Sequence, residues 1–113
     1  GSVVRIMEAA TSALVQGATN AAQLAVEQTA AKGDIAAAFI IECGGRRLIL
    51  GERFEEELRV YRDVVGMDVP IMGPLLYGEI GPMPGSKSLF HNKTVVVWAL
   101  STKTWGDLLM KEG

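Results

Sequence analysis

The chain has 113 residues, of which 49% are hydrophobic and 21% are charged, and its formal net charge is −2. This length and composition predict one globular domain with its own core and exclude an intrinsically disordered chain. The small negative charge argues against a nucleic-acid or anionic-membrane partner, and no apolar run reaches the roughly 20 residues of a membrane span.

Cysteine usage and the two ends of the chain bear on location and domain organisation. Cys43 is the only cysteine, so no internal disulfide can form, and a reducing, cytoplasmic setting is expected. The N-terminus lacks the pattern of a signal peptide. Gly1 and Ser2 are typical of a cloning scar, so we expect residues 3–113 to form a single domain taken from a longer protein.

The N-terminal third predicts a short strand and a long helix. Val3–Met7 favours β structure and is expected as an edge strand or as a segment arriving from another domain. The Ala-rich stretch from Thr11 to about Lys32 predicts a helix, with Thr11 or Ser12 as its N-cap and Gly33 as its stop. Small side chains on one face should let this helix lie close to a sheet; that face consists of Leu14, Ala18, Ala21, Ala25 and Thr29.

The middle of the chain predicts a strand followed by a second helix. Ile35–Ile41 is an unbroken apolar run between turn signals, which indicates a central strand covered on both faces. Gly44–Arg47 could form a backbone nest for an anion or, more simply, a turn with two solvated arginines. A helix is expected over Glu52–Val65, with the acidic run Glu55–Glu57 on its solvated face and Gly66 as its stop. Its apolar stripe comprises Leu50, Phe54, Leu58, Tyr61 and Val65.

The C-terminal third predicts strands and a final helix. Proline and glycine interrupt the strand region Val69–Ile80, so this region is expected at a sheet edge or with a bulge. A hairpin should pair Tyr77–Pro82 with Leu89–Thr94, and the second strand should continue to Leu100 in alternation. Thr102–Met110 predicts a helix. The order (β)αβαββ indicates an α+β fold with a small mixed or antiparallel sheet, helices packed on it, and a long hairpin at the end.

Several polar residues could carry chemistry. Cys43 lies beside two arginines that could activate a thiol, although a buried structural cysteine is the simpler interpretation. Glu79 is flanked by glycines that leave room for a partner, such as an amino group or an arginine; an exposed strand-end glutamate fits equally well. A triad of Cys43, His91 and Glu79 can be drawn, but no spacing demands it. A single histidine is a poor metal site, and we expect no metal or cofactor.

An ordered set of motifs resembles a known family. The set consists of Ala38–Gly51 with its Cys-Gly-Gly-Arg turn, Glu55–Leu58, Pro70–Gly73, Tyr77–Pro82 and Phe90–Thr94. It is similar to the C-terminal domain of FIST proteins (F-box and intracellular signal transduction proteins). The resemblance implies a sensory domain without catalysis that binds a small ligand, such as an amino acid or other small carboxylate. The implied partners are a FIST N-like domain and a signalling output domain or protein, and a homodimer is a further expectation.

The matching positions are the candidate ligand-binding residues that the resemblance implies: Cys43, Gly45, Arg46, Tyr77, Gly78, Glu79, His91 and Asn92. In the leading hypothesis, Arg46 takes a ligand carboxylate in a bidentate contact, and Glu79 takes its amine with help from Tyr77 or Asn92. Two alternatives remain open. One is an interaction or self-association module without a ligand, and the other is an enzyme that depends on Cys43 and His91.

Overall fold

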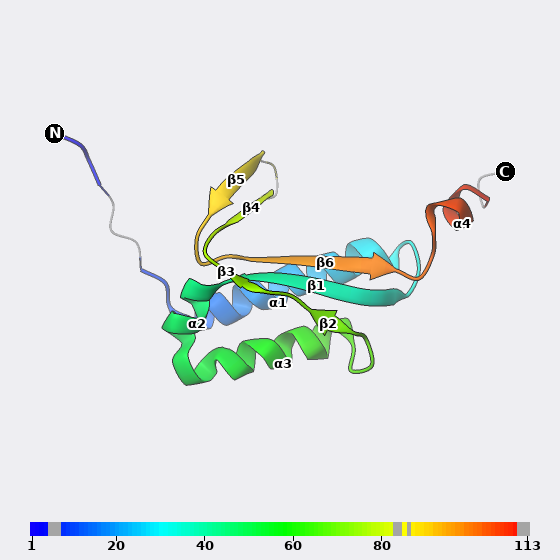
Figure 1. Cartoon of the computed structure of the whole chain (residues 1–113), viewed down its shortest axis with the longest axis horizontal. Coiled ribbons are helices and arrows are strands. Elements are labelled where there is room, and N and C mark those ends of the chain that lie inside the picture. The colour runs from blue at the N-terminus through cyan, green and yellow to red at the C-terminus, as the bar shows by residue number, and fades with distance from the viewer. Residues whose placement is uncertain (5–7, 83–84, 86, 111–113) are drawn as a thin grey trace.

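The structure is a computed structural model that describes residues 1–4, 8–82, 85 and 87–110. Figure 1 shows its elements in chain order. They are α1 (Thr11–Ala30), β1 (Ile35–Cys43), α2 (Gly44–Leu50), the 3-10 turn η1 (Gly51–Arg53), α3 (Phe54–Val65), β2 (Ile71–Met72), β3 (Leu75–Leu76), β4 (Glu79–Pro82), β5 (Ser88–His91), β6 (Val95–Ser101) and α4 (Trp105–Met110).

The strands form two sheets, and the larger one is mixed. Strand β1 lies at its centre, with β2 and β3 paired parallel to it on one side and β6 paired antiparallel on the other. Strands β4 and β5 form a separate antiparallel hairpin, with Glu79 opposite His91 and Pro82 opposite Ser88. The predicted α+β class and hairpin are thereby confirmed. The part of the predicted hairpin loop at residues 83, 84 and 86 lies outside the described residues.

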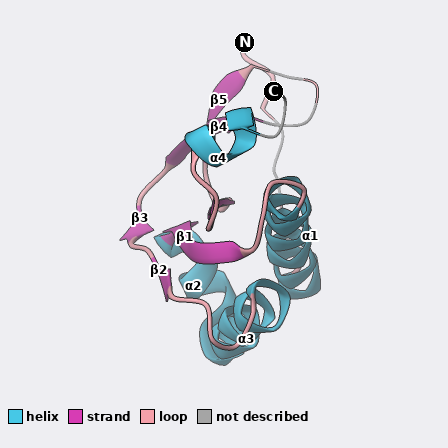
Figure 2. Cartoon of the chain, turned by 90° about the vertical axis from the view of Figure 1, so that its right-hand side faces the viewer, coloured by secondary structure: helices cyan, strands magenta, loops and turns pink. Residues whose placement is uncertain are grey.

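One face of the larger sheet is covered by helices. Figure 2 shows α1 and α3 together on this side, while the β4–β5 hairpin lies on the other. Small side chains on α1 allow the close approach: Ala18 and Ala22 are buried together with Ile40 and Tyr61. A second buried cluster joins Leu14, Leu50 and Phe54. These clusters confirm the predicted face of the long helix at Leu14 and Ala18, whereas Ala22 is buried in place of Ala21. They also confirm most of the apolar stripe of the second helix.

The prediction that the central strand is covered on both faces is wrong. Only alternate residues of β1 face the helices, and its other face carries Phe39 between Met72 and Trp98 of the neighbouring strands. The side chains of Met72 and Trp98 are 67% and 62% exposed. The unbroken apolar run therefore has two causes, because one set of side chains builds the core and the other lines an open sheet face.

The ends of the first helix differ from the prediction. Residue Ala10 occupies the N-cap position without a side-chain cap, and the Thr11 hydroxyl instead accepts a hydrogen bond from Arg53 at 2.6 Å. The helix ends at Ala30, three residues before Gly33. Val3 and Val4 lie outside any strand, and the rest of the predicted N-terminal strand, residues 5–7, is outside the described part of the chain.

Two further segments were predicted incorrectly. Gly44–Arg47 is neither a nest nor a turn but the beginning of α2. The predicted strand from Leu89 to Leu100 is two strands in different sheets, because the chain turns between β5 and β6, where Lys93 has a φ of +60°. The predicted alternation holds within β6, where Val95 and Val97 pack against the helix-side core.

The predicted final helix is confirmed as α4, and Thr104 and Asp107 cap its first turn.

Gly73 lies where β2 gives way to β3, and its packing leads to a test. A methyl group at this position would overlap the carbonyl group of Ile40 on β1. Gly73→Ala is therefore expected to lower the free energy of unfolding by about 1–3 kcal/mol, the usual cost of overpacking. Gly17 on α1 has open space around it, so Gly17→Ala is a matched control expected to be neutral or slightly stabilising. Urea denaturation measures both, and equal stability of the two variants would contradict the close packing.

Candidate functional site

A buried ion pair joins α2 to α3. The guanidinium of Arg46 makes a bidentate contact with Glu57, with Nε–Oε1 at 3.0 Å and Nη2–Oε2 at 2.5 Å. It also donates to the backbone carbonyls of Leu14 at 2.7 Å and Lys93 at 2.9 Å. Arg46 is 3% exposed and Glu57 is fully buried. The predicted solvated arginine and the predicted solvated glutamate are thus both wrong at these positions, and a ligand carboxylate at Arg46 would have to displace Glu57.

Sequence reasoning missed Glu57 because it treated three consecutive glutamates alike. Glu57 follows Phe54 by three positions and precedes Tyr61 by four, and both neighbours are buried. That spacing places all three side chains on the inner face of the helix. The signal was therefore present in the periodicity. Leu58, which was predicted to be buried, is instead 48% exposed.

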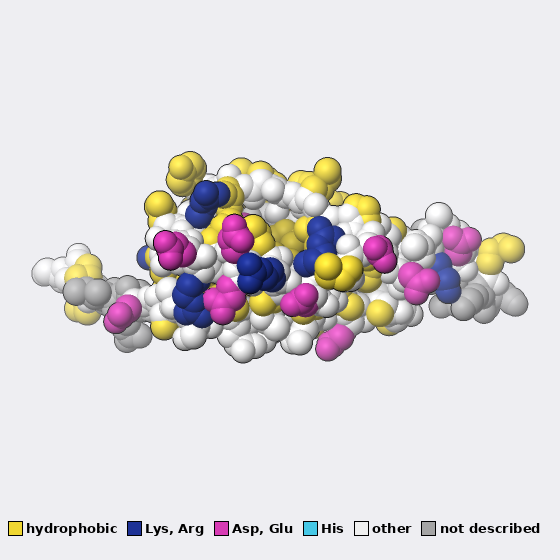
Figure 3. All heavy atoms as spheres, turned by 90° about the horizontal axis from the view of Figure 1, so that it is seen from below, with side chains coloured by type: hydrophobic (Ala, Val, Ile, Leu, Met, Phe, Trp, Pro, Cys, Tyr) yellow, Lys and Arg dark blue, Asp and Glu magenta, His cyan; other side chains and the backbone are white. Residues whose placement is uncertain are grey.

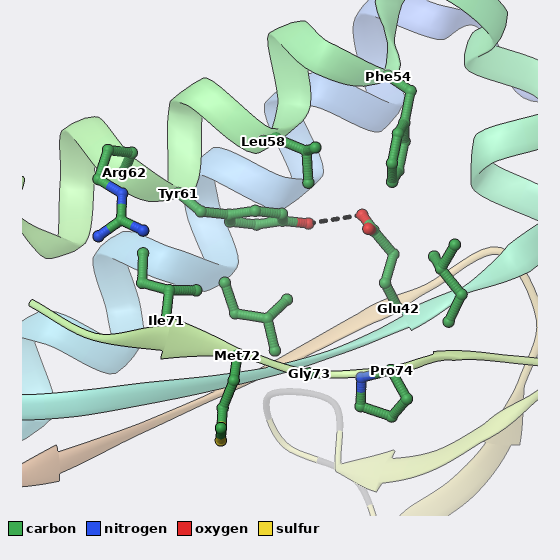
Figure 4. Close-up of a pocket in the computed structure, with 11 residues that line it drawn as sticks. Glu42, Phe54, Leu58, Tyr61, Arg62, Ile71, Met72, Gly73 and Pro74 are labelled. Atoms are coloured by element: carbon green, nitrogen blue, oxygen red, sulfur yellow. Dashed lines mark hydrogen bonds between the residues drawn. The ribbon is translucent and has the colours of Figure 1, made fainter.

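Glu42 and Tyr61 extend the polar network toward the sheet edge. The Tyr61 hydroxyl donates to Glu42 Oε1 at 2.8 Å (Figure 4). Arg46 Nε lies 3.6 Å from the same oxygen. Burial raises the pKa of Glu42 to about 8, and the neighbouring Glu57 adds to the rise. Burial also raises the pKa of Tyr61. Burial therefore favours the uncharged form of Glu42, while Arg46 and Glu57 form an ion pair with each other.

A second polar centre lies between the hairpin and the larger sheet. Glu79 on β4 accepts a hydrogen bond at Oε2 from the Thr94 hydroxyl, at 2.7 Å. Its other oxygen, Oε1, is buried and has no hydrogen-bond partner among the described residues. A buried polar atom without a partner costs about 1–3 kcal/mol, so such an atom requires an explanation. A bound ligand or water that donates a hydrogen bond would supply one.

Two further predicted site residues, Cys43 and Gly45, lie beside this centre. The backbone N–H of Cys43 donates to the carbonyl of Thr94 at 3.1 Å, and the Cys43 side chain is buried. Gly45 lies beside the Cys43 sulfur, since a Cβ on the glycine would be 3.5 Å from Sγ. Cys43, Gly45 and Glu79 thus come together at the end of the sheet where α2 begins.

The hairpin holds the other predicted site residues. His91 lies opposite Glu79 in the β4–β5 register, and its Nε2 is 3.2 Å from the carbonyl oxygen of Gly81. Gly78 lies against the ring of Phe90. The side chains of Tyr77 and Asn92 are exposed. The structure therefore places these residues around the same end of the sheet, and their predicted role in ligand binding stays a prediction.

The outer face of α3 carries charges of both signs. Figure 3, which views this side of the molecule, shows Lys and Arg side chains interspersed with Asp and Glu. Arg53 pairs with Glu56 at 2.7 Å and Arg59 with Glu55 at 3.8 Å. The solvated face predicted for the second helix is confirmed at Glu55 and Glu56. Within the described residues, no helix has the length and apolar character to cross a membrane, and no three His, Cys, Asp or Glu side chains form a possible metal site.

Comparison with known proteins gives one result. A protein-family model described as the FIST C domain matches residues 1–82, which is more than two thirds of the chain. The match includes the helices α1 to α3 and the strands β1 to β4. We found no curated protein and no solved structure that matches the chain.

Proposed function

Because this chain belongs to the FIST C domain family, a domain type associated with signal transduction, we propose that it is a sensory domain. In this proposal the domain binds a small ligand without catalysis and passes the signal to a partner domain. A FIST N-like domain and a signalling output domain or protein are the proposed partners. The buried thiol of Cys43 supports a structural role for this residue and so favours sensing over catalysis.

One observation supports a specific ligand chemistry. The Oε1 atom of Glu79 is buried and lacks a donor among the described residues. A carboxylate oxygen in this state is suited to an ammonium group, because charge-assisted hydrogen bonds are the stronger kind. We therefore place the amino group of the ligand at Glu79, as the sequence hypothesis does. Arg46 has a different role in the revised proposal, since it holds Glu57 and the carbonyl of Lys93.

The position of Glu79 also suggests how binding becomes a signal. Glu79 belongs to the hairpin, and Thr94, to which it is bonded, precedes β6 of the larger sheet. A ligand that reaches Oε1 must enter between these two sheets. Binding would then favour one arrangement of the hairpin over another, and the output would follow from the difference in affinity.

A thermal-shift screen tests this proposal with matched probes. Each L-amino acid is compared with its amide, which keeps the ammonium group, and with its N-acetyl derivative, which keeps only the carboxylate. A compound that binds, present at a free concentration one hundred times its Kd, should raise the free energy of unfolding by about 2.7 kcal/mol. We expect at least one amino acid and its amide to raise the melting temperature while the N-acetyl form does not.

Variants localise the effect. Glu79→Gln is expected to abolish the shift, and Glu55→Gln, at an exposed position on α3, is expected to retain it. The proposed site is wrong if the N-acetyl form stabilises equally well or if Glu79→Gln responds like the parent chain.

The open face of the larger sheet favours a second candidate function, an interaction or self-association module. Phe39, Met72 and Trp98 lie side by side across three strands on this face. Large exposed apolar patches commonly mark protein interfaces. Concentration-dependent self-association in sedimentation experiments, with no effect of any small molecule, would favour this function over ligand sensing.

A further inference from the structure

A groove runs between α3 and the edge formed by β2 and β3. Its volume is about 380 Å³, which lies within the usual range for small-molecule sites, roughly 300–1,000 Å³. Figure 4 shows Leu58 above the groove, Met72, Gly73 and Pro74 below it, and Glu42 pointing toward Tyr61 inside it. None of these side chains belongs to the polar centre at Glu79.

The groove is open because no other part of the described chain covers the side chains on its two walls. Leu58 on α3 and Leu75 on β3 both line it, and they are 48% and 40% exposed. Gly73 contributes no side chain and must stay small because it lies against the carbonyl of Ile40. The result is an apolar cleft whose walls keep part of their surface open to solvent.

The inner end of the groove is polar and deeply buried. Glu42 and Tyr61 line it, are 3% and 2% exposed, and are joined by a 2.8 Å hydrogen bond. The pKa of Glu42 is raised to about 8, first by burial. Burial therefore favours the uncharged form of this carboxyl group, which can both donate and accept a hydrogen bond. The charge of Glu57 behind it is balanced by Arg46.

This arrangement selects against charged ligands. A ligand with a full charge would lose its hydration at the inner end and find no free counter-charge there. Arg62 also lines the groove, but Figure 4 shows its guanidinium on the far side of Tyr61 from Glu42. Its Nη1 donates there to the carbonyls of Val69 at 2.6 Å and Met67 at 3.4 Å, so its charge does not lie at the inner end. A neutral hydroxyl or amide group can bond to the carboxyl of Glu42 without such a cost.

A peptide strand fits this edge poorly. Strands β2 and β3 have two residues each, and Gly73 and Pro74 separate them. Short, proline-interrupted edge strands resist the addition of another strand.

We propose that the groove between α3 and the β2–β3 edge binds a neutral, largely apolar small molecule with one hydroxyl or amide group. The polar group of the ligand bonds to the Glu42–Tyr61 pair, and its apolar part covers Leu58 and Leu75. This site goes beyond the proposed sensory function. It is separate from Glu79, and it takes a neutral ligand, whereas Glu79 takes an ammonium group.

Three probes with the same ring and different charges test the proposal: 4-methylbenzyl alcohol, 4-methylbenzoate and 4-methylbenzylammonium. Each is titrated into the isotope-labelled chain at pH 7, and amide chemical shifts are followed by NMR. The alcohol is expected to give saturable shifts at Gly73, Leu75 and Tyr61. The two charged probes are expected to bind at least about tenfold more weakly, a difference of about 1.4 kcal/mol.

A matched pair of variants locates the binding site. Leu58→Trp places a larger side chain over the groove and is expected to weaken binding of the alcohol by about tenfold or more. Leu48→Trp makes the same change at an exposed position on α2 and is expected to bind like the parent. The proposal is overturned by the absence of saturable shifts in the parent chain, by equal binding of the charged probes, or by unchanged binding in a folded Leu58→Trp variant. Because the shift mapping uses the parent chain, it decides the question even if that variant does not fold.

Discussion

Replacement of Arg46 by methionine is expected to lower the free energy of unfolding by about 3–5 kcal/mol, because it leaves a buried charge without its partner. Glu57 is fully buried, and Arg46 donates a hydrogen bond to each of its two carboxylate oxygens. Methionine can fill part of the space that the Arg46 side chain occupies, but it cannot donate a hydrogen bond. The carbonyls of Leu14 and Lys93 lose their donor as well. Denaturation in urea or guanidinium chloride measures the loss.

Two comparisons separate the ion pair from general effects of removing an arginine. Arg47→Met removes the neighbouring exposed guanidinium, which lies 5.4 Å from the ring centre of Phe54, and should cost about 1 kcal/mol or less. The double variant Arg46→Met with Glu57→Gln removes both charges and should be more stable than Arg46→Met alone. If Arg46→Met lowers the free energy of unfolding no more than Arg47→Met does, the ion pair does not stabilise the fold. The hypothesis from the sequence, in which Arg46 binds a ligand carboxylate, would then regain support.

The stability of the parent chain is expected to fall as the pH rises from about 5 to about 8, because of Glu42. The pKa of this carboxyl is about 8 in the folded chain, against an ordinary value of 4.5. Between these values the unfolded chain releases the proton and the folded chain retains it, so rising pH favours unfolding. The loss is at most about 1.4 kcal/mol per pH unit, or about 4–5 kcal/mol over the whole range.

Glu42→Gln provides the test, since glutamine cannot ionise and can still accept the hydrogen bond from Tyr61. Its free energy of unfolding, measured by denaturation at pH 5, 6, 7 and 8, should lack most of the decline seen in the parent. Glu55→Gln, at an exposed position, should keep the parental slope. A flat parental profile, or the same slope in Glu42→Gln, would show that Glu42 does not retain its proton in the folded chain.

Part of the candidate site could be predicted because its signal is local. The glycines beside Glu79 indicate a residue with room for a partner, and the structure finds one oxygen of this carboxylate buried without a donor among the described residues. The role of Arg46 could not be predicted in the same way. Its bidentate carboxylate partner lies 11 positions away, and its two carbonyl partners lie 32 and 47 positions away. The groove at Leu58 likewise depends on the approach of β3 to α3.

Several of the elements were determined by the sequence alone, because helix propensity, apolar periodicity and turn residues act over a few neighbouring positions, whereas α2 was not predicted. The Ala-rich helix, the strand from Ile35, the helix ending before Gly66 and the β4–β5 hairpin all follow from such signals. Tertiary structure alone decided which apolar face of β1 is covered and where the last predicted strand divides. It also decided the pairing of Arg46 with Glu57, because burial and ion pairing depend on which distant segments the fold brings together.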